Sequence, residues 1–420
     1  MSIAVFSDAP WPTKRLKFCA SYNDEVLSES TGDFEPIQYV EISDVSLVGG
    51  IEKSTPMLFH EAPSRARRKV RDGDILVSTV RTYLKAIAAV SDAPADLIAS
   101  TGFCVVRPNE GLDAGYAGWV AKSEEFVGEV VSRSVGVSYP AINASQLVNI
   151  DIPMPPLETQ KRIAAFLDEK TARIDALIAK KEALLERLAE KRQAIITQAV
   201  TKGLNLAAPM KDSGIDWLGQ IPAHWEVKRL KFLGRTRYGL GEPPERDDEG
   251  IPFIRATDIY RGRIDLSAVQ RVAKDAVPWR RRPQLEAGEV LVVRSGAYTG
   301  DSALVTHEIA GFIAGYDMVY TPEKINSLFI AFTLLSKFMI DGQIFIAKQR
   351  AAQPHLNAEE LGDFVCALPP QGEQDDIAEY LEKRRDELGG AEGQISRSIN
   401  QLTEYRSALI TAAVTGQLEI

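Results

Sequence analysis

Arginine-rich clusters occur at two comparable places in this 420-residue sequence. SRARRKVRD spans positions 64–72 and WRRRP spans positions 279–283. A guanidinium group forms paired hydrogen bonds with phosphate oxygens and with the acceptor edge of guanine. We therefore predict nucleic-acid contacts from Arg65, Arg67, Arg68, Lys69, Arg280, Arg281 and Arg282. The alternative is that each cluster is a solvated basic loop.

Each cluster is followed by a Gly-acid turn and a second candidate loop, VRTYLK at 80–85 and VRSGAYTG at 293–300. These loops place Arg81 and Arg294 beside the aromatic residues Tyr83 and Tyr298. Small residues, as in the second loop, let the backbone approach a ligand closely. Arg81 and Arg294 therefore join the predicted contacts. Alternatively, both tyrosines are core residues with a bonded hydroxyl.

The total charge argues at first against a nucleic-acid partner. The formal net charge is −9 at pH 7, whereas phosphate binding usually leaves a basic footprint. However, the acidic residues are spread along the chain and the basic residues are clustered. The charge argument therefore has to be made locally.

Motifs for catalysis and for metal binding are missing from the sequence. There is no GxxxxGK[ST] loop, no GxGxxG and no Asp/Asn-Pro-Pro-aromatic string. Three cysteines and four histidines are scattered, which argues against a zinc site or a disulfide framework. The acidic triplet at 168–170 could suggest a nuclease, but a solvated helical turn explains it better. We predict a non-catalytic binding protein with no metal site and no cofactor of its own.

An internal duplication with an offset of 214 residues organises the chain. Residues 14–18 and 228–232 both read KRLKF. The same offset relates Trp11 to Trp225, Asp44 to Asp258, the pair Pro155–Pro156 to Pro369–Pro370, and Gln160 to Gln374. The chain therefore consists of one unit written twice.

Each copy combines a mixed β-rich part with a long helix. Short β-rich runs and Gly, Pro, Asn and Asp punctuation predict globular domains at 1–156 and 205–370. The segments 157–204 and 371–420 lack an interior proline and predict long helices that begin after the proline pairs. The predicted fold class is α+β, with two homologous mixed domains joined by two long helices.

The two helices carry apolar residues in seven-residue series, which is typical of a coiled coil. The predicted seam residues are Ile163, Leu167, Ile174, Leu177, Leu184, Leu188, Ile195, Ile377, Leu381, Leu388, Ile395, Leu402 and Leu409. Antiparallel pairing would place the globular domains at opposite ends and give the molecule an approximate internal twofold. The alternative is that each helix packs only on its own domain. Gly389, Gly390 and Gly393 predict a bend or a broken segment in the second helix.

The hydropathy pattern predicts no membrane span and no secretory signal. The longest apolar run, SLFIAFTLL at 327–335, is too short to cross a bilayer. We expect a cytoplasmic protein.

Several of these stretches together resemble the specificity subunit of type I restriction-modification enzymes. They are MKDSGIDWLGQIPAHWEVKRLKF at 210–232, GEVLVVRSGAYTG at 288–300, QPHLN at 353–357 and the run from IPMPPLETQKRIAAFL to QAVTKGL at 152–204. The first copy departs from this pattern, with SYPAIN at 138–143 in place of QPHLN, and VRTYLK without glycines.

This resemblance implies that each globular part is a target recognition domain that reads one half of a bipartite double-stranded DNA sequence. It further implies that the helices fix the spacer and dock two modification (methyltransferase) subunits, and that restriction subunits join them. The partners would use S-adenosylmethionine, ATP and Mg. The alternative function is a coiled-coil scaffold that binds only proteins.

Overall fold

The computed structural model describes residue 6, residues 9–349 and residues 354–420. Gln353 of the QPHLN string lies outside the described residues. The chain forms two compact units, each containing part of both long helices. Unit 1 comprises Met1–Glu182 with Ser396–Ile420, and unit 2 comprises Ala183–Ile395.

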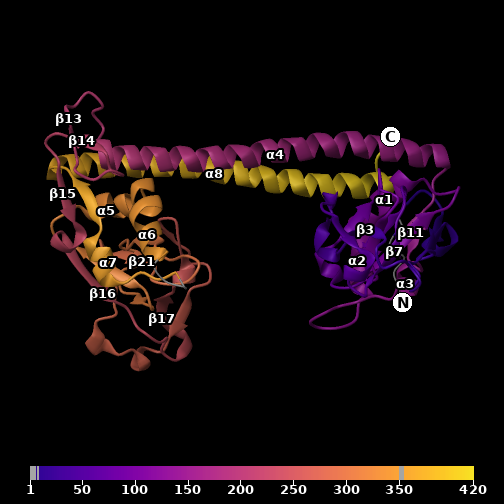
Figure 1. Cartoon of the computed structure of the whole chain (residues 1–420), viewed down its shortest axis with the longest axis horizontal. Helices are drawn as coiled ribbons and strands as arrows, with labels where there is room; N and C mark the ends of the chain where they lie inside the picture. Colours follow the sequence, from indigo (N-terminus) through magenta and orange to yellow (C-terminus); the bar gives the residue numbers. More distant parts are fainter. Residues whose placement is uncertain (1–5, 7–8, 350–353) are drawn as a thin grey trace. The chain divides into compact units, whose positions relative to one another are not determined.

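Unit 1 contains two four-stranded sheets (Figure 1). The antiparallel sheet has the strand order β2 (Ala20–Tyr22), β11 (Phe103–Pro108), β8 (Ile75–Ser78) and β9 (Ile87–Ala89). The second sheet has the order β6 (Thr55–Leu58), β3 (Pro36–Val40), β10 (Leu97–Ser100) and β7 (Ala66–Lys69), with β3 and β10 parallel. Helix α1 (Ala114–Lys122) contributes Tyr116 and Val120 to the same core cluster as Ile75 and Val77 of β8.

Unit 2 repeats this topology. Its antiparallel sheet has the order β16 (Gly234–Tyr238), β24 (Met318–Pro322), β21 (Val290–Val292) and β22 (Ser302–Leu304). Its second sheet has the order β20 (Gln270–Val272), β17 (Arg246–Ile254) and β23 (Ile313–Ala314), again with a parallel pair, β17 and β23. Helix α5 (Ser327–Leu334) occupies the place of α1. The structure therefore confirms the mixed α/β class and the internal repeat.

The smaller elements connect these sheets. In unit 1 they are β1 (Thr13–Arg15), η1 (Leu16–Phe18), η2 (Ile42–Asp44), β4 (Val45–Ser46), β5 (Gly50–Ile51), η3 (Phe59–Glu61), η4 (Thr82–Leu84), α2 (Glu124–Ser132), α3 (Ala144–Leu147) and β12 (Asp151–Pro153). In unit 2 they are β13 (Met210–Asp212), β14 (Gln220–Pro222), β15 (Glu226–Arg229), η5 (Leu230–Phe232), η6 (Ala256–Asp258), β18 (Ile259–Tyr260), β19 (Arg263–Ile264), η7 (Lys274–Ala276), η8 (Trp279–Arg281), the π-helix η9 (Phe338–Ile344), α6 (Phe345–Lys348), α7 (Ala358–Asp363) and β25 (Val365–Leu368).

Both long helices begin directly after a proline pair. Helix α4 spans Leu157–Lys202 and α8 spans Gln371–Val414. The side chain of Gln160 accepts a hydrogen bond from the Asp113 N–H and donates to the Pro155 carbonyl. Gln374 repeats both bonds, with the Asn326 N–H and the Pro369 carbonyl. Each helix start is therefore fastened to its own unit by one buried amide.

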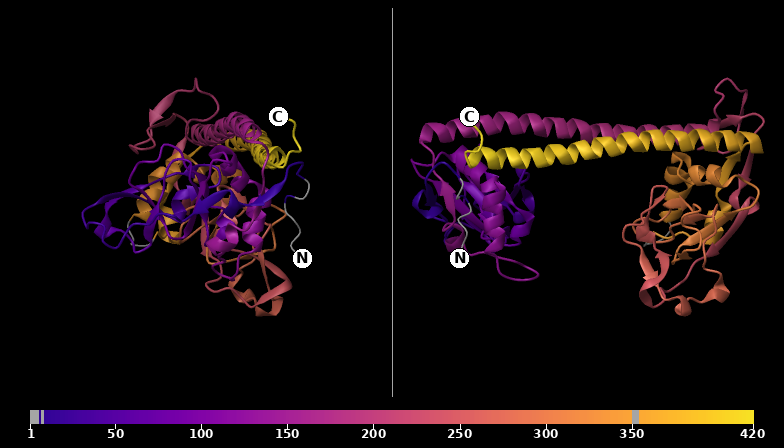
Figure 2. Two further views of the ribbon diagram at one scale, coloured as in Figure 1. Left: turned by 90° about the vertical axis from the view of Figure 1, so that its right-hand side faces the viewer. Right: turned by 180° about the vertical axis from the view of Figure 1, so that it is seen from behind.

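The two helices pack antiparallel within each unit (Figures 1 and 2). In unit 1, Arg406 of α8 pairs with Asp175 of α4, and Arg162 donates to the carbonyl of Ile420. In unit 2, Arg192 of α4 pairs with Glu392 of α8, whereas Ile196 lies in one core cluster with Leu381. In both units the partner number falls as the α4 number rises, which defines the antiparallel sense.

The predicted seam is partly wrong. The series Leu167, Ile174, Leu188 and Ile195 lies buried or half-buried on α4, as Leu381, Leu388, Ile395, Leu402 and Leu409 do on α8. Ile163 and Ile377 are buried as well. By contrast, Leu177 is 48% exposed and Leu184 is 45% exposed.

The cause is the offset of the second series. The less exposed residues follow the first series by four positions, at Thr171, Ile178, Leu185 and Arg192 on α4 and at Arg385, Glu392, Ile399, Arg406 and Ala413 on α8. A 3.6-residue helix places i+4 beside i on one face as readily as i+3, so the apolar residues at i+3 suggested the wrong stripe. The real stripe contains charged side chains, which a search for apolar heptads passes over.

A break in α8 is excluded, because the helix continues through Gly389, Gly390 and Gly393. A Cβ atom on Gly389 would lie 2.8 Å from a guanidinium nitrogen of Arg263 in the same unit. The packing of α8 against α4 and against the globular part of unit 2 outweighs the helix-propensity cost of about 1 kcal/mol per glycine.

Among the described residues, no single helix is long and apolar enough to cross a membrane. One bent pair, α5 with Phe338–Lys348, passes that test by length and composition. Its apolar residues Phe329, Ile330 and Met339 lie in the core of unit 2, so folding already accounts for them.

Candidate nucleic-acid interface

Strand β7 carries three of the predicted contacts, and they do not all face the surface. Lys69 is exposed, and the Arg67 guanidinium lies 5.0 Å from the ring centre of Phe59. The Nε atom of Arg68 is buried and has no hydrogen-bond partner among the described residues. Burial raises the pKa of Cys104 to about 12, although the charge of Arg68 opposes the shift. Arg68 therefore reaches toward the core, and Arg67 and Lys69 are better placed to meet a ligand.

Arg65 precedes β7 and already has an acidic partner. It forms an ion pair with Glu41 and donates from Nε to the Tyr39 hydroxyl at 3.3 Å. These two groups raise the pKa of Arg65 further above its usual value. A phosphate bound here would have to replace the Glu41 carboxylate.

The second arginine cluster forms the exposed turn η8. Arg280, Arg281 and Arg282 are all exposed, and Arg282 has a left-handed backbone with φ of 49°. Trp279 beside them is 40% exposed, and its indole N–H donates to the Lys274 carbonyl. This cluster offers three cations and an aromatic face in one turn.

The structure shifts the correspondence of the two clusters by one residue. Ile98 bridges to Lys69, and its counterpart Ile313 bridges to Gln284. The local offset is therefore 215, which pairs Arg65 with Arg280 and Arg67 with Arg282. The offset of 214 that relates the KRLKF strings would pair Arg67 and Arg68 with Arg281 and Arg282, and this pairing is wrong because one extra residue lies between the aligned strands.

The loops after β8 and β21 have the same backbone despite their different sequences. The Ser78 N–H donates to the Ala86 carbonyl, and the Val293 N–H donates to the Asp301 carbonyl, again 215 residues apart. In unit 2 the left-handed positions are Gly296 and Gly300, with φ of 90° and 89°.

In unit 1 the same positions are Arg81 and Lys85, with φ of 51° and 53°. Both side chains are exposed. A long side chain in this conformation costs of order 1–3 kcal/mol, and such residues gather at functional sites. The loop of unit 1 thus places two cations where unit 2 has glycines.

Arginine–tyrosine stacks lie beside these loops in both units. Arg81 lies 4.6 Å from the ring centre of Tyr139. Arg294 lies between two rings, 4.6 Å from Tyr238 and 4.7 Å from Tyr316. Stacking holds a guanidinium plane in place while its N–H edge stays available for hydrogen bonds. The arrangement suits recognition of phosphate or of a base edge.

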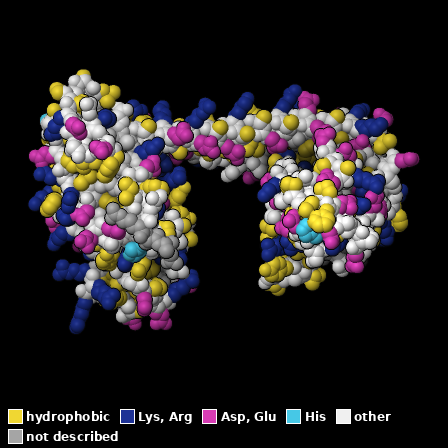
Figure 3. All heavy atoms as spheres, viewed as in Figure 1, with side chains coloured by type: hydrophobic (Ala, Val, Ile, Leu, Met, Phe, Trp, Pro, Cys, Tyr) yellow, Lys and Arg dark blue, Asp and Glu magenta, His cyan; other side chains and the backbone are white. Residues whose placement is uncertain are grey.

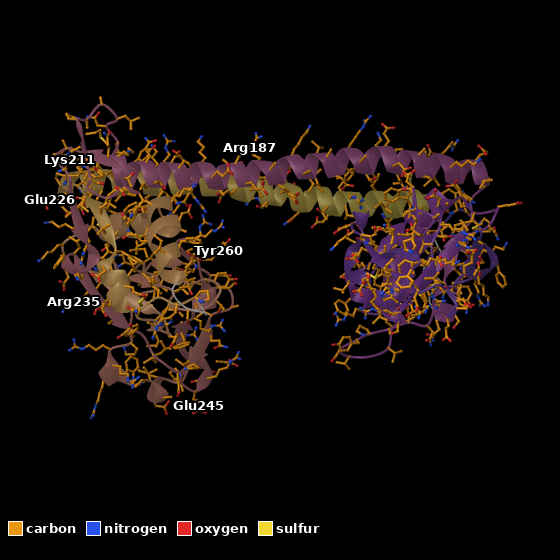
Figure 4. All side chains as sticks on the ribbon, viewed as in Figure 1. Arg187, Lys211, Glu226, Arg235, Glu245 and Tyr260 are labelled. Carbon is orange, nitrogen blue, oxygen red and sulfur yellow. The ribbon has the colours of Figure 1, made fainter. Side chains whose placement is uncertain are left out.

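The two loop tyrosines are surface residues, so the alternative that they belong to the core is wrong. Tyr83 is 51% exposed and Tyr298 is 43% exposed. Tyr298 packs edge-on against Tyr260, whose ring also carries Arg261 at 5.1 Å. Figure 4 shows Tyr260 at the edge of unit 2, on the opposite side of the unit from Arg235.

A buried carboxylate lies under the loop of unit 2. Asp317 accepts the N–H of Arg294 at 3.1 Å, while its other oxygen has no partner among the described residues. Burial raises the pKa of Asp317 to about 6. In unit 1 the equivalent N–H, that of Thr79, donates to the Gly102 carbonyl. The acceptor beneath this loop is therefore a titratable carboxyl group in unit 2 and a backbone carbonyl in unit 1.

Sequence reasoning missed Tyr139, Tyr238, Tyr316 and Asp317. Tyr139 precedes Pro140, a proline that the duplication relates to Pro354, so the repeat offered a signal for it. Tyr238 ends β16 and Tyr316 lies in the bend between β23 and β24, and only the fold brings them to Arg294.

The positive charge near these groups comes from individual side chains and not from a broad basic surface. On the face of the described residues drawn in Figure 3, basic and acidic side chains are interspersed over both units. Among the described residues, no cluster of three His, Cys, Asp or Glu side chains could hold a metal ion, and the three cysteines are buried and free.

Comparison with protein families gives one matching description over most of the chain. The family profile described as the type I restriction modification DNA specificity domain matches residues 66–187 and 222–400. The two matches fall on the two copies of the internal repeat.

Curated relatives and solved structures agree. The chain is 24% identical over 334 residues to the type I restriction enzyme EcoKI specificity subunit of Escherichia coli, covering 75% of this chain and 68% of the relative. It is 25% identical to the EcoBI specificity subunit of the same species, covering 70% of this chain and 64% of the relative. The chain spans about two thirds of the length of these relatives.

One solved structure superposes on this chain with a TM-score of 0.77 at 22% identity. Its description concerns complex assembly and conformational transition of the type I R-M system, and the superposition covers 98% of this chain and 99% of that chain. The HsdS subunit from Thermoanaerobacter tengcongensis superposes with a TM-score of 0.50 at 23% identity, covering 97% of each chain.

Proposed function

Because the chain belongs to the type I restriction-modification DNA specificity family, we propose that it directs a partner enzyme to a bipartite DNA sequence, each unit reading one half. The chain provides sequence recognition and no catalysis. The observation that supports the bipartite reading is the repeated head, because the same two sheets, helix and loop occur once in each unit. Two homologous heads suit two separate DNA elements.

We assign the target recognition domains to 1–156 and 205–370, and the helical segments to 157–204 and 371–420. The helices fix the spacing of the two DNA elements and dock two modification subunits. Restriction subunits join this assembly, and the partners use S-adenosylmethionine, ATP and Mg. The complex works in the cytoplasm.

The DNA contacts that we propose have unequal support from their surroundings. The better supported contacts are exposed or stacked on aromatic rings, and they are Arg67, Lys69, Arg81, Arg280, Arg281, Arg282 and Arg294. Arg65 and Arg68 have weaker support, because Glu41 pairs with the first and the second is directed to the core. Arg294, held between two tyrosine faces, suits guanine, whose O6 and N7 accept a bidentate pair.

Selection of duplexes from a random library tests this function. The chain, co-expressed with a methyltransferase subunit from the same genome, should enrich one sequence with two conserved elements. Affinity for that duplex should fall steeply between 50 and 200 mM salt, because bound phosphates release counterions. A coiled-coil scaffold that binds only proteins would enrich no sequence, and that result would refute the proposal.

A further inference from the structure

The segment after α2 projects from unit 1 as an open, apolar loop (Figures 1 and 2). Val135 is 78% exposed, Tyr139 is 62% exposed and Val137 is fully exposed. Gly136 between the valines has φ of 121°, which allows the sharp turn at the tip. Folding does not account for these side chains, because they contribute nothing to the core of unit 1.

The loop is nevertheless held in a defined position. Val135 and Ala141 exchange both backbone hydrogen bonds at 2.9 and 3.0 Å, which closes the loop as a short hairpin. The Ser134 hydroxyl hydrogen-bonds to the Thr82 hydroxyl at 2.7 Å, and the Arg81 N–H donates to the Pro140 carbonyl at 2.7 Å. The hairpin and the strained loop that carries Arg81 and Lys85 therefore form one surface.

The charges around the tip favour a polyanion. Residues 131–141, VSRSVGVSYPA, contain no acidic side chain. Arg81 stacks on Tyr139 at the base of the hairpin, and Lys85 is exposed on the adjoining loop. An apolar tip with cations near its base suits a DNA groove, where phosphates border base edges. In an intact duplex the apolar group on those edges is the thymine methyl in the major groove.

We propose that the hairpin 133–141 inserts Val137 into the major groove, where it contacts the methyl group of a thymine in the DNA element read by unit 1. This inference rests on the proposed function and adds an apolar contact to it. Arg81 and Lys85 hold the flanking phosphates, and Val137 distinguishes thymine from the other bases. By the offset of the repeat, η9 and α6 of unit 2 correspond to α2, and the counterpart of the hairpin falls at 347–355, partly outside the described residues, so the proposal concerns unit 1 alone.

The test combines a protein variant with a DNA variant. The duplex selected by the complex is remade with each thymine of the unit 1 element replaced in turn by deoxyuridine, which removes only the methyl group. Val137→Ser is compared with Val137→Leu, which keeps an apolar tip, and with Val48→Ser. Val48 is 54% exposed elsewhere in unit 1 and gives the matched control.

The complex with the wild-type chain should lose affinity about fourfold at one thymine, since one buried methyl group is worth about that factor. Val137→Ser should bind the original duplex about fourfold more weakly and show no further loss with deoxyuridine there. Val137→Leu and Val48→Ser should retain the deoxyuridine effect. The salt dependence should stay unchanged in Val137→Ser, because an apolar contact releases no counterions.

Three results would overturn the inference: no thymine position is sensitive, Val137→Ser remains sensitive, or Val137→Ser loses partner binding instead of DNA selectivity. Because Val137 is fully exposed, its substitution should not change thermal unfolding. If no duplex is selected at all, the proposed function fails, and that outcome is distinct from a selected duplex whose thymines are insensitive.

Discussion

Removing the guanidinium of Arg406 should loosen α8 from unit 1, and the structure sets the size of the effect. Arg406 is 7% exposed in its side chain and binds Asp175 through two nitrogens, at 2.8 and 3.2 Å. Its guanidinium also lies 5.9 Å from the ring centre of Trp119. Arg406→Met keeps much of the volume and removes the charge and both hydrogen bonds.

Three contributions determine the magnitude. A hydrogen bond to a charged group is worth about 1.5–3 kcal/mol, and breaking a fully buried ion pair costs about 3–5 kcal/mol. Asp175 is 35% exposed and can regain water, which lowers that cost. Burial and, secondarily, the charge of Arg406 lower the pKa of nearby Lys122 to about 8, so the variant also relieves a repulsion. We expect a net loss of about 2 kcal/mol in the local free energy of opening.

Hydrogen exchange of the full chain provides the assay. Amides of Thr403–Val414 should exchange about thirtyfold faster in Arg406→Met, the equivalent of about 2 kcal/mol. The matched control is Arg192→Met, at the equivalent position of α4. Arg192 meets Glu392 at only 3.5 Å with both side chains partly exposed, so the loss there should stay below about 1 kcal/mol.

Lys122 supplies a second readout with a defined sign. Its pKa is lower in the folded state than in the unfolded state, so the unfolded chain binds more protons between about pH 8 and the usual value of 10.5. Stability from this group therefore rises as pH increases through that range. In Arg406→Met the rise should begin at higher pH. Equal exchange in the two methionine variants, or an unchanged pH profile, would refute the reasoning.

Three further predictions concern the loops and the helices. Asp317→Asn should stabilise unit 2 at pH 7 by up to about 3 kcal/mol. The pKa of this buried carboxyl is raised to about 6, so its ionisation costs stability, and the cost is complete above pH 6. Thermal unfolding should therefore show the wild type, but not the variant, gaining stability when the pH falls from 7 to 5. Arg81→Gly should raise the unfolding free energy of unit 1 by about 1 kcal/mol while weakening binding to the selected duplex, and a variant that loses stability would contradict the strain argument. Inserting seven residues in both α4 and α8 should lengthen the DNA spacer by about 10.5 Å, or about three base pairs, and leave the recognised bases unchanged. A change in the recognised bases would contradict the proposal that the globular domains recognise the bases and the helices fix the spacing.

The repeat and the domain-to-helix junctions could be predicted because their determinants are local in sequence. The KRLKF strings, the proline pairs and the glutamines at 160 and 374 all recur at the same offset of 214 residues. Proline fixes the helix start wherever it stands, and Gln160 donates to the carbonyl of Pro155, five residues before it. Features of this kind can be predicted from the sequence without knowledge of the rest of the fold.

The seam and the arginine pairing could not be predicted correctly, for a different physical reason. Choosing between Leu177 and Ile178 as the buried residue requires knowledge of which face of α4 the opposite helix covers, and both are apolar. The one-residue shift between Lys69 and Gln284 depends on strand register, which cross-strand hydrogen bonds determine. In both cases long-range pairing decides between local solutions of similar energy.

The loops at Arg81 and Gly296 show how one fold can carry two chemistries. If the left-handed backbone served the fold alone, glycine would be the lower-energy residue at both positions of both units, as it is at Gly296 and Gly300. A Cβ atom on Gly300 would lie 2.3 Å from Ile344, so unit 2 cannot accept a lysine there without repacking. In unit 1 the equivalent chain is α2, an α-helix, and the side chains of Arg81 and Lys85 are exposed. The contacts of Arg81 with Tyr139 and with the Pro140 carbonyl tie this loop to the hairpin 133–141, so the cations and the apolar tip should be lost or kept together when the specificity of this unit is changed.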